Sequence, residues 1–272
     1  MKTLLLGYDI GSSSVKANLT DADSGKTIAS AAVPETEMEI ISRKTGWAEQ
    51  DPAVWWSNLA EATGKVMQSA GVKSSSIAAI GISYQMHGLV AVDKQQRVLR
   101  PAIIWCDSRA VEIGEKSFGE LGPDYCFRHL LNSPGNFTAS KLKWVLDHEP
   151  EIASRIYKVM LPGDFIAMKM TGEISTTAPG FPKGSCTTTS RPGRRRNSYI
   201  TSVLIGDLSP ISCLHSAYRG NSPPRRHKNL VLHRAHRFVT ARAISQTTRT
   251  RSRLFIREKW RPPQEPPELS TP

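Results

Sequence analysis

The chain has 272 residues, which is enough for one large domain or two smaller ones. Its net charge of +12 is unevenly distributed, since residues 1–180 carry 18 basic and 20 acidic side chains and residues 181–272 carry 18 basic and only 4 acidic ones. The charge therefore gives no reason to expect a nucleic-acid partner for the first 180 residues. No apolar run approaches the ~20 residues of a membrane-spanning helix.

The cysteines and the N-terminus bear on the cellular compartment. Four cysteines, at positions 106, 126, 186 and 213, form no CxxC pair and have no spacing typical of a metal site. The apolar run at residues 4–6 is too short for the core of a signal peptide. Free thiols without an export signal favour a reducing cytoplasm.

The first expected elements surround a short turn rich in glycine and serine. A buried strand ends in Asp9, the turn Gly11-Ser12-Ser13-Ser14 follows, and strands at 15–20 and 27–33 complete a meander. Gly11 lets the backbone approach a ligand closely, and successive N–H groups in such a turn form an anion-binding concavity. Asp9 beside the turn can hold a magnesium ion through water. The alternative is an ordinary hairpin with exposed Asp and Ser side chains.

The rest of the first 180 residues alternates between strand and helix patterns. A helix is expected at 54–71, with Asp51 as its N-cap, Pro52 in its first position and Gly71 as its stop. Further strands are expected at 77–82, 89–92, 102–104 and 159–161, and further helices at 110–121, 139–148 and 165–170. This order predicts an α/β domain.

Polar side chains follow two of these strands directly. Ser83-Tyr84-Gln85-Met86-His87-Gly88 follows the strand at 77–82, and Trp105-Cys106-Asp107-Ser108-Arg109 follows the strand at 102–104. Open α/β sheets bind ligands just beyond the carboxyl ends of their strands. The sequence therefore predicts a ligand site at these strand ends.

Each of these residues also has a purely structural interpretation. His87 and Trp105 could belong to the core, Arg109 could be half of a surface ion pair of little energetic value, and Asp164 could cap its helix. Their joint occurrence at successive strand ends favours the ligand site.

The motifs of residues 4–180 together resemble the amino-terminal domain of the FGGY carbohydrate kinases. Within that family they are most similar to the xylulokinases, because the Met86-His87 pair stands where glycerol kinases place Arg-Glu. The matching segments, in family order, are Asp9-Ile10-Gly11-Ser12-Ser13-Ser14-Val15-Lys16, Gly46-Trp47-Ala48-Glu49-Gln50-Asp51-Pro52 with Trp55-Trp56, Gln85-Met86-His87-Gly88, Trp105-Cys106-Asp107-Ser108-Arg109, Ala139-Ser140-Lys141-Leu142-Lys143-Trp144, Leu161-Pro162-Gly163-Asp164 and Thr171-Gly172-Glu173.

The resemblance implies a ribonuclease-H-like, actin-like ATPase fold, in which a mixed sheet is flanked by helices. Family members have two such domains, with sugar and ATP meeting in the cleft between them. The implied reaction transfers the γ-phosphoryl group of ATP, with Mg²⁺, to a sugar hydroxyl, here converting D-xylulose to D-xylulose 5-phosphate. The resemblance also allows a homodimer of the full-length protein.

The resemblance assigns expected roles to individual residues. Asp9 matches the family aspartate near the metal and the transferring phosphoryl group, which it would reach through water. The phosphate turn is matched by Gly11, Ser12 and Ser13, and Lys16 falls where some members carry a basic residue. The sugar-binding motif is matched by Gln85, Met86 and His87, and Trp105, Asp107 and Asn136 fall at or near further sugar-facing positions. A sugar needs neutral donors and acceptors and one apolar wall, which Gln85, His87 and Trp105 supply.

The resemblance ends near residue 180, where the composition changes. Lys outnumbers Arg by 12 to 6 before this point, Arg outnumbers Lys by 15 to 3 after it, and 10 of the 18 prolines fall in the last 92 residues. This low-complexity, Arg- and Pro-rich composition predicts an unfolded tail at 181–272.

Two interpretations of the tail compete. One is a basic arm for nucleic acid, which the lack of aromatic interleaving disfavours. The other, which we favour, is a change of reading frame. A chosen set of degenerate codons for residues 181–186 gives Ser-Glu-Gly-Ile-Leu in a neighbouring frame, which resembles how the family continues.

On this interpretation the chain is the sugar-binding half of a xylulokinase-like enzyme. The family's catalytic base is an aspartate in a later glycine-rich segment, and the ATP-binding domain also follows residue 180. No catalytic base is therefore expected in this chain, which should be inactive alone. The alternatives are an FGGY kinase for another sugar or polyol, a catalytically inactive sugar-binding domain, and a non-catalytic basic nucleic-acid-binding protein.

Overall fold

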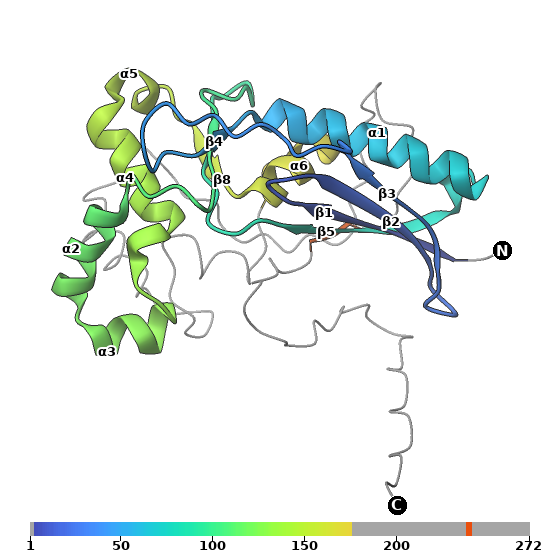
Figure 1. The fold of residues 1–272 in the computed structure, drawn as a ribbon, viewed down its shortest axis with the longest axis horizontal. Helices are drawn as coiled ribbons and strands as arrows, with labels where there is room; N and C mark the ends of the chain where they lie inside the picture. The colour runs from blue at the N-terminus through green and yellow to red at the C-terminus, as the bar shows by residue number, and fades with distance from the viewer. Residues whose placement is uncertain (1–2, 176–237, 241–272) are drawn as a thin grey trace, which may run out of the picture.

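The computed structural model describes residues 3–175 and 238–240, and a mixed five-stranded sheet lies at its centre (Figure 1). The strand order is β3-β2-β1-β5-β9. β1 (Leu4–Ile10) pairs antiparallel with β2 (Val15–Asp21), which pairs antiparallel with β3 (Thr27–Val33). β5 (Ile77–Tyr84) lies parallel to β1, and β9 (Phe238–Thr240) lies parallel to β5. The parallel pair β1 and β5 therefore ends at one edge of the sheet.

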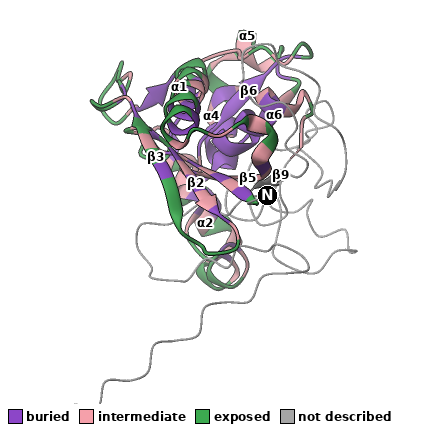
Figure 2. Ribbon diagram, turned by 90° about the vertical axis from the view of Figure 1, so that its right-hand side faces the viewer, coloured by how far each residue is buried: buried purple, intermediate pink, exposed green. Residues whose placement is uncertain are grey.

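Helix α1 (Pro52–Ala70) packs along the meander of this sheet (Figures 1 and 2). The helix begins at Asp51, whose carboxylate accepts a hydrogen bond from the N–H of Ala53, and stops at Gly71, which has φ +61°. In β1 every second residue is buried, and one of these, Tyr8, is hydrogen-bonded at 2.7 Å to Thr63 of α1. Edge strand β3 is largely exposed, as Figure 2 shows. The main hydrophobic core thus lies between the sheet, α1 and α6 (Pro162–Thr171).

Helices α2 to α5 and two short strand pairs lie beyond the end of the sheet where β1 and β5 finish (Figure 1). Two short strand pairs are β4 (Glu49–Gln50) with β7 (Ala102–Ile103) and β6 (Val90–Val92) with β8 (Lys158–Met160). The helices are α2 (Val111–Leu121), α3 (Pro123–Tyr125), which continues into a π-helical turn at Cys126–Leu130, α4 (Thr138–His148), α5 (Pro150–Ala153) and α6 (Pro162–Thr171), with 3-10 turns at Ser74–Ser76 and Pro134–Asn136. A second hydrophobic cluster, which includes Ile103, Cys126, Leu142 and Val145, holds α4 to this region.

The expected mixed α/β domain is confirmed, and strand 27–33 has the predicted bounds. Three short elements were not predicted, namely strand β4 and helices α3 and α5. Elements of two to four residues carry no measurable periodicity. The prediction of an unfolded tail lies outside the described residues, except at 238–240, where the three-residue strand β9 departs from it. Among residues 3–175 and 238–240, no helix is long and apolar enough to cross a membrane.

Candidate functional site

The candidate site begins where β1 and β5 end next to one another. Their last residues, Ile10 and Tyr84, are partners in the parallel register, and the N–H of Gln85 donates to the carbonyl of Ile10 at 2.9 Å. The turn that starts at Gly11 and the motif that starts at Gln85 therefore leave the sheet side by side. A Cβ on Gly163 of α6 would lie only 2.0 Å from the ring of Tyr84, so this helix packs directly against the end of β5.

The turn after β1 has the tight geometry that its sequence predicts. The N–H of Gly11 donates to the carbonyl of Ser14 at 3.1 Å, and a Cβ on Gly11 would lie 3.0 Å from that same oxygen. Asp9 faces Lys16 in the antiparallel register, with a carboxylate oxygen 3.7 Å from the ammonium group. Both side chains are largely exposed, so this ion pair contributes little to stability. The structure thus brings Asp9, Gly11 and Lys16 together, with Ser12 and Ser13 inside the turn.

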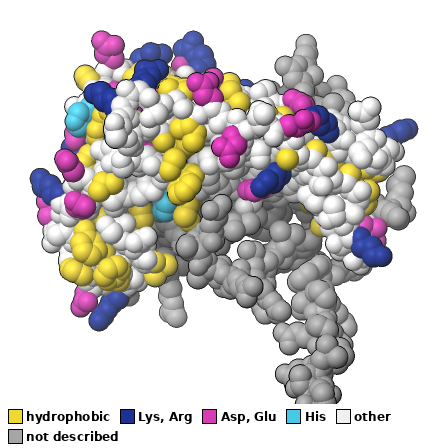
Figure 3. All heavy atoms as spheres, viewed as in Figure 1, with side chains coloured by type: hydrophobic (Ala, Val, Ile, Leu, Met, Phe, Trp, Pro, Cys, Tyr) yellow, Lys and Arg dark blue, Asp and Glu magenta, His cyan; other side chains and the backbone are white. Residues whose placement is uncertain are grey.

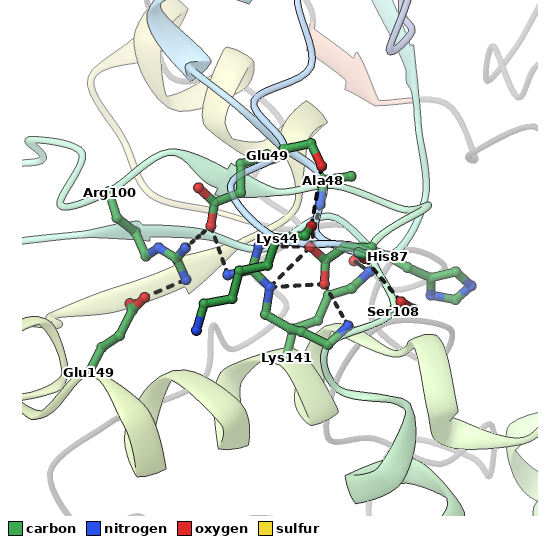
Figure 4. Close-up of polar contacts among 12 residues, drawn as sticks. Lys44, Ala48, Glu49, His87, Arg100, Ser108, Lys141 and Glu149 are labelled. Atoms are coloured by element: carbon green, nitrogen blue, oxygen red, sulfur yellow. Dashed lines mark hydrogen bonds and ion pairs between the residues drawn. The ribbon is translucent and has the colours of Figure 1, made fainter.

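The motif after β5 is held in an unusual backbone conformation at His87. This residue has φ +60°, in the left-handed region that side chains rarely adopt. Its imidazole stacks on Phe137 with ring centroids 5.2 Å apart, and its carbonyl accepts a hydrogen bond from Lys141 Nζ at 2.9 Å. Figure 4 shows the imidazole pointing away from the buried charged groups. Ring and backbone of His87 are therefore fixed by two different side chains.

Trp105 joins the turn after β1 to the segment before α4. Its indole N–H donates to the hydroxyl of Ser12 at 3.3 Å, and its carbonyl accepts from the side-chain amide of Asn136. The Trp105 side chain is exposed, which suits an apolar wall and contradicts the core interpretation. Within the described residues, the buried oxygens Gln85 Oε1 and Asn136 Oδ1 have no hydrogen-bond partner, and a rotation of either side chain would be needed to present its oxygen to a ligand.

Asp107 does not lie with the other candidate sugar contacts, because its side chain is fully buried. Its carboxylate accepts from the N–H of Ala48 at 2.6 Å and from the guanidinium of Arg109 at 2.7 Å. Arg109 also lies 2.7 Å from Glu49, and Glu49 in turn pairs with Arg100. These four side chains are called the buried ion network below. Asp107 therefore anchors the loop after β7 rather than facing a ligand.

Arg109 is the centre of the buried ion network, so it is not part of a surface ion pair. Its guanidinium has no exposed area and lies against two indole rings, 3.9 Å from the ring centroid of Trp47 and 4.9 Å from that of Trp144. The structural interpretation of Asp164 is supported, because its carboxylate accepts from the N–H of Leu161 at the start of α6.

Lys141 of α4 is buried, and no carboxylate of the described residues lies within hydrogen-bond distance of its ammonium group. Its Nζ donates to the carbonyls of His87 at 2.9 Å and Asn136 at 3.3 Å. Burial lowers the pKa of Lys141 to about 7, although the nearby charge of Asp107 acts to raise it. A neutral amine has two N–H donors, which match these two carbonyls.

The turn and Asp9 fit the groups that a phosphoryl donor would bring. Among residues 3–175 and 238–240, no group of three or more His, Cys, Asp and Glu side chains could hold a metal. Mg²⁺ needs no such cluster, since it keeps several waters and binds one or two carboxylates together with phosphate oxygens. Asp9 at the strand end would hold such an ion through water, and the backbone N–H groups of the turn would bind phosphate oxygens.

Residues 4–179 match the N-terminal domain of the FGGY family of carbohydrate kinases. The chain belongs to this family. Over 176 residues it is 40% identical to xylulose kinase of Escherichia coli K12, which covers 64% of this chain and 34% of that protein. This FGGY chain therefore spans about a third of the length of the curated relatives it matches.

Solved structures confirm the expected actin-like fold. Xylulose kinase from Rhodospirillum rubrum aligns with a TM-score of 0.62 at 26% identity, over 68% of this chain and 38% of that one. A ligand-bound xylulose kinase from Lactobacillus acidophilus aligns with a TM-score of 0.71 at 20% identity, over 87% of this chain and 47% of that one, and supports the fold alone.

Two residues with central places in the site, Gln50 and Lys141, were missed from the sequence. Both stand inside segments that carry the FGGY resemblance, at 46–52 and 139–144. That position was the available signal. Neither residue was singled out because a glutamine before a helix cap and a lysine on a helix usually face solvent.

Proposed function

We propose that this chain is the sugar-binding part of an ATP- and magnesium-dependent xylulokinase that converts D-xylulose to D-xylulose 5-phosphate. The observation that carries the proposal is the exit of the Gly11 turn and the Gln85-Met86-His87 motif side by side from β1 and β5. This arrangement supports a single site in which a sugar hydroxyl and a phosphoryl group meet. The identity to xylulose kinases over residues 4–179 supports xylulose as the sugar.

The residues of this part bind and orient the substrates. The side-chain amides of Gln85 and Asn136, whose buried oxygens have no partner among the described residues, would rotate to bind sugar hydroxyls, and the exposed Trp105 ring covers the apolar face of the sugar. The imidazole of His87 adds a polar contact whose position is fixed by Phe137. Asp9 and the N–H groups of the turn would hold ATP and magnesium, which supply the phosphoryl group and neutralise its charge. Asp107 acts indirectly, by holding the loop that carries Trp105.

We further propose that the 272-residue chain does not phosphorylate D-xylulose by itself. The resemblance places the catalytic base and the adenosine contacts of the family in segments that follow its amino-terminal domain, and the match to that domain ends at residue 179. Without a base for the attacking hydroxyl, the rate falls by roughly 10²–10⁴. Loss of domain closure also removes the alignment of the two substrates and the exclusion of water.

The alternatives differ in what the chain binds. Figure 3 shows basic and acidic side chains interspersed over one face of the described part, which does not favour a nucleic-acid surface there. A kinase for another sugar or polyol keeps the same site with different hydroxyl contacts. The nucleic-acid-binding protein and the kinase for another sugar or polyol can therefore be told apart by the ligand that the chain binds.

Titration calorimetry of the full chain tests these proposals directly. D-xylulose should bind more tightly than glycerol or L-ribulose, and a coupled ADP-release assay with D-xylulose and ATP should stay at background. Equal affinity for the three ligands, or salt-dependent DNA binding without sugar binding, would contradict the xylulokinase assignment. Sugar-dependent ADP release would contradict only the proposed inactivity.

A further inference from the structure

Gln50 lies between the two halves of the candidate site. The residue is only 2% exposed, although it belongs to the two-residue strand β4, which pairs with β7 outside the five-stranded sheet. Its amide nitrogen donates to the carbonyl of Ser12 at 2.7 Å and to that of Glu39 at 3.2 Å. Its amide oxygen accepts from the indole N–H of Trp55 at 3.1 Å and faces the side-chain amide of Gln85 at 3.5 Å. One side chain thus contacts the turn after β1 and the motif after β5.

The orientation of this amide is fixed by partners that cannot exchange roles. The indole N–H of Trp55 can only donate, so the amide oxygen must face it. The carbonyls of Ser12 and Glu39 can only accept, so the amide nitrogen must face them. Both donors and both acceptor positions of Gln50 are therefore engaged. No other side chain of similar length offers two donors and two acceptor positions at these places.

We propose that Gln50 is a positioning residue that ties the phosphate turn to the sugar-binding motif through one buried amide. This inference rests on the proposed function, since it concerns how the two parts of that site are set against each other. Ser12 also accepts the indole N–H of Trp105, so a shift of the Ser12 backbone reaches the apolar wall of the sugar site. Gln85 carries the unpartnered Oε1 described above, so its rotation would redirect that acceptor.

The isosteric change Gln50→Glu separates positioning from general packing. Its ionised carboxylate has no donor for Ser12 and Glu39 and would repel their carbonyl oxygens. When protonated, the same group regains one O–H donor and keeps a carbonyl for Trp55. Burial raises the pKa of such a carboxyl, which brings its titration into an accessible pH range.

The test measures D-xylulose affinity of the full chain by titration calorimetry between pH 5.5 and 8. We expect Gln50→Glu to weaken binding about tenfold at pH 8 and to recover most of that loss at pH 5.5, whereas Gln50→Ala should show a loss that does not depend on pH. The ratio of the dissociation constants of variant and wild type at the same pH removes the titration of Lys141, whose pKa of about 7 lies within this range. Gln68→Glu, which places the same charge on the exposed last turn of α1, should match wild type at every pH.

A nuclear magnetic resonance measurement reports on the phosphate-turn side. The indole N–H signal of Trp105, assigned with Trp105→Phe, should shift in Gln50→Glu, because that N–H donates to the hydroxyl of Ser12, whose carbonyl Gln50 binds. If Gln50→Glu does not fold by circular dichroism, Trp55→Phe replaces it, and its affinity should fall at least threefold.

The outcomes distinguish the two proposals. Absence of D-xylulose binding by wild type would overturn the proposed function itself. Wild-type binding with an affinity ratio near one for Gln50→Glu, or with a loss that is equal at both pH values, would overturn the positioning role alone. Unchanged affinity of Trp55→Phe would do the same if that variant is used.

Discussion

Lys141 should make the stability of this chain rise with pH. Burial lowers its pKa from the ordinary 10.5 to about 7 in the folded chain, whereas the unfolded chain keeps the ordinary value. Between these two values the unfolded state binds one more proton than the folded state, so raising the pH favours folding. Below about pH 7 both states are protonated and this dependence disappears. From pH 7 to pH 9 the gain in the free energy of unfolding should be about 2 kcal/mol.

The hydrogen bonds of Lys141 do not oppose this expectation. The neutral amine still donates to the carbonyls of His87 and Asn136, so deprotonation removes the cost of a buried charge without breaking either contact. The charged or titratable groups that act on Lys141 are Asp107, Cys106 and Arg109, and all of them remain when Lys141 is replaced. The difference between wild type and Lys141→Met therefore isolates the lysine.

Urea unfolding followed by circular dichroism at pH 7, 8 and 9 provides the assay. Wild type should gain about 2 kcal/mol relative to Lys141→Met across this range. Lys143→Met is the matched control, because it removes one positive charge from a partly exposed position on the same helix and should follow wild type. Parallel stability profiles for wild type and Lys141→Met would show that the buried amine is not neutral in the folded chain.

Three further changes probe the site and its support. His87→Asn keeps a residue that tolerates φ +60° and removes the imidazole, so D-xylulose affinity should fall about 5- to 150-fold by calorimetry with little change in melting temperature; unchanged affinity would return His87 to a structural role. Trp105→Phe keeps an apolar wall but loses the bond to Ser12, and should weaken binding less than Trp105→Ala; the reverse order would contradict the wall. Arg109→Met leaves two buried carboxylates short of a cation and should cost about 3–5 kcal/mol in urea unfolding, and a cost below 1 kcal/mol would show that the buried ion network is not needed.

The elements that the sequence predicted correctly are those with a strong periodic signal or a capping residue. Helix α1 combines an N-cap at Asp51, proline in the first position and glycine at the stop, and each acts through local geometry. β1 begins with a run of three leucines, and β2 alternates apolar and polar residues. By contrast, β4 has two residues and exists only because β7 pairs with it from 52 positions away, which is a tertiary contact that no local pattern encodes.

The candidate site divides in a similar way. The strand ends that meet, at Gly11 and Gln85, could be predicted, because parallel strands in an α/β sheet finish at one edge. Which polar side chains face that edge could not, since a strand end and its turn offer several directions. Gln50 and Lys141 were missed because their burial depends on partners distant in sequence.

Asp107 shows how a residue in a sugar-kinase motif can serve the site without facing the sugar. Its Oδ1 accepts the backbone N–H of Arg109 at 2.9 Å, two residues further on, and its Oδ2 accepts the guanidinium of the same residue. An aspartate whose side chain accepts a hydrogen bond from the backbone N–H of the second residue after it forms a local Asx turn. When that second residue is an arginine, its guanidinium can also pair with the carboxylate. The spacing Asp-x-Arg after a strand was therefore a sequence signal for a fixed loop. That loop follows Trp105 directly and is tied at 2.6 Å to Ala48, two residues before Gln50, so the buried ion network fixes the segment from which the Gln50 amide reaches Ser12. A change in either should thus disturb Trp105 and Ser12 together, which links the stability of Arg109→Met to the Trp105 indole signal that reports on Gln50.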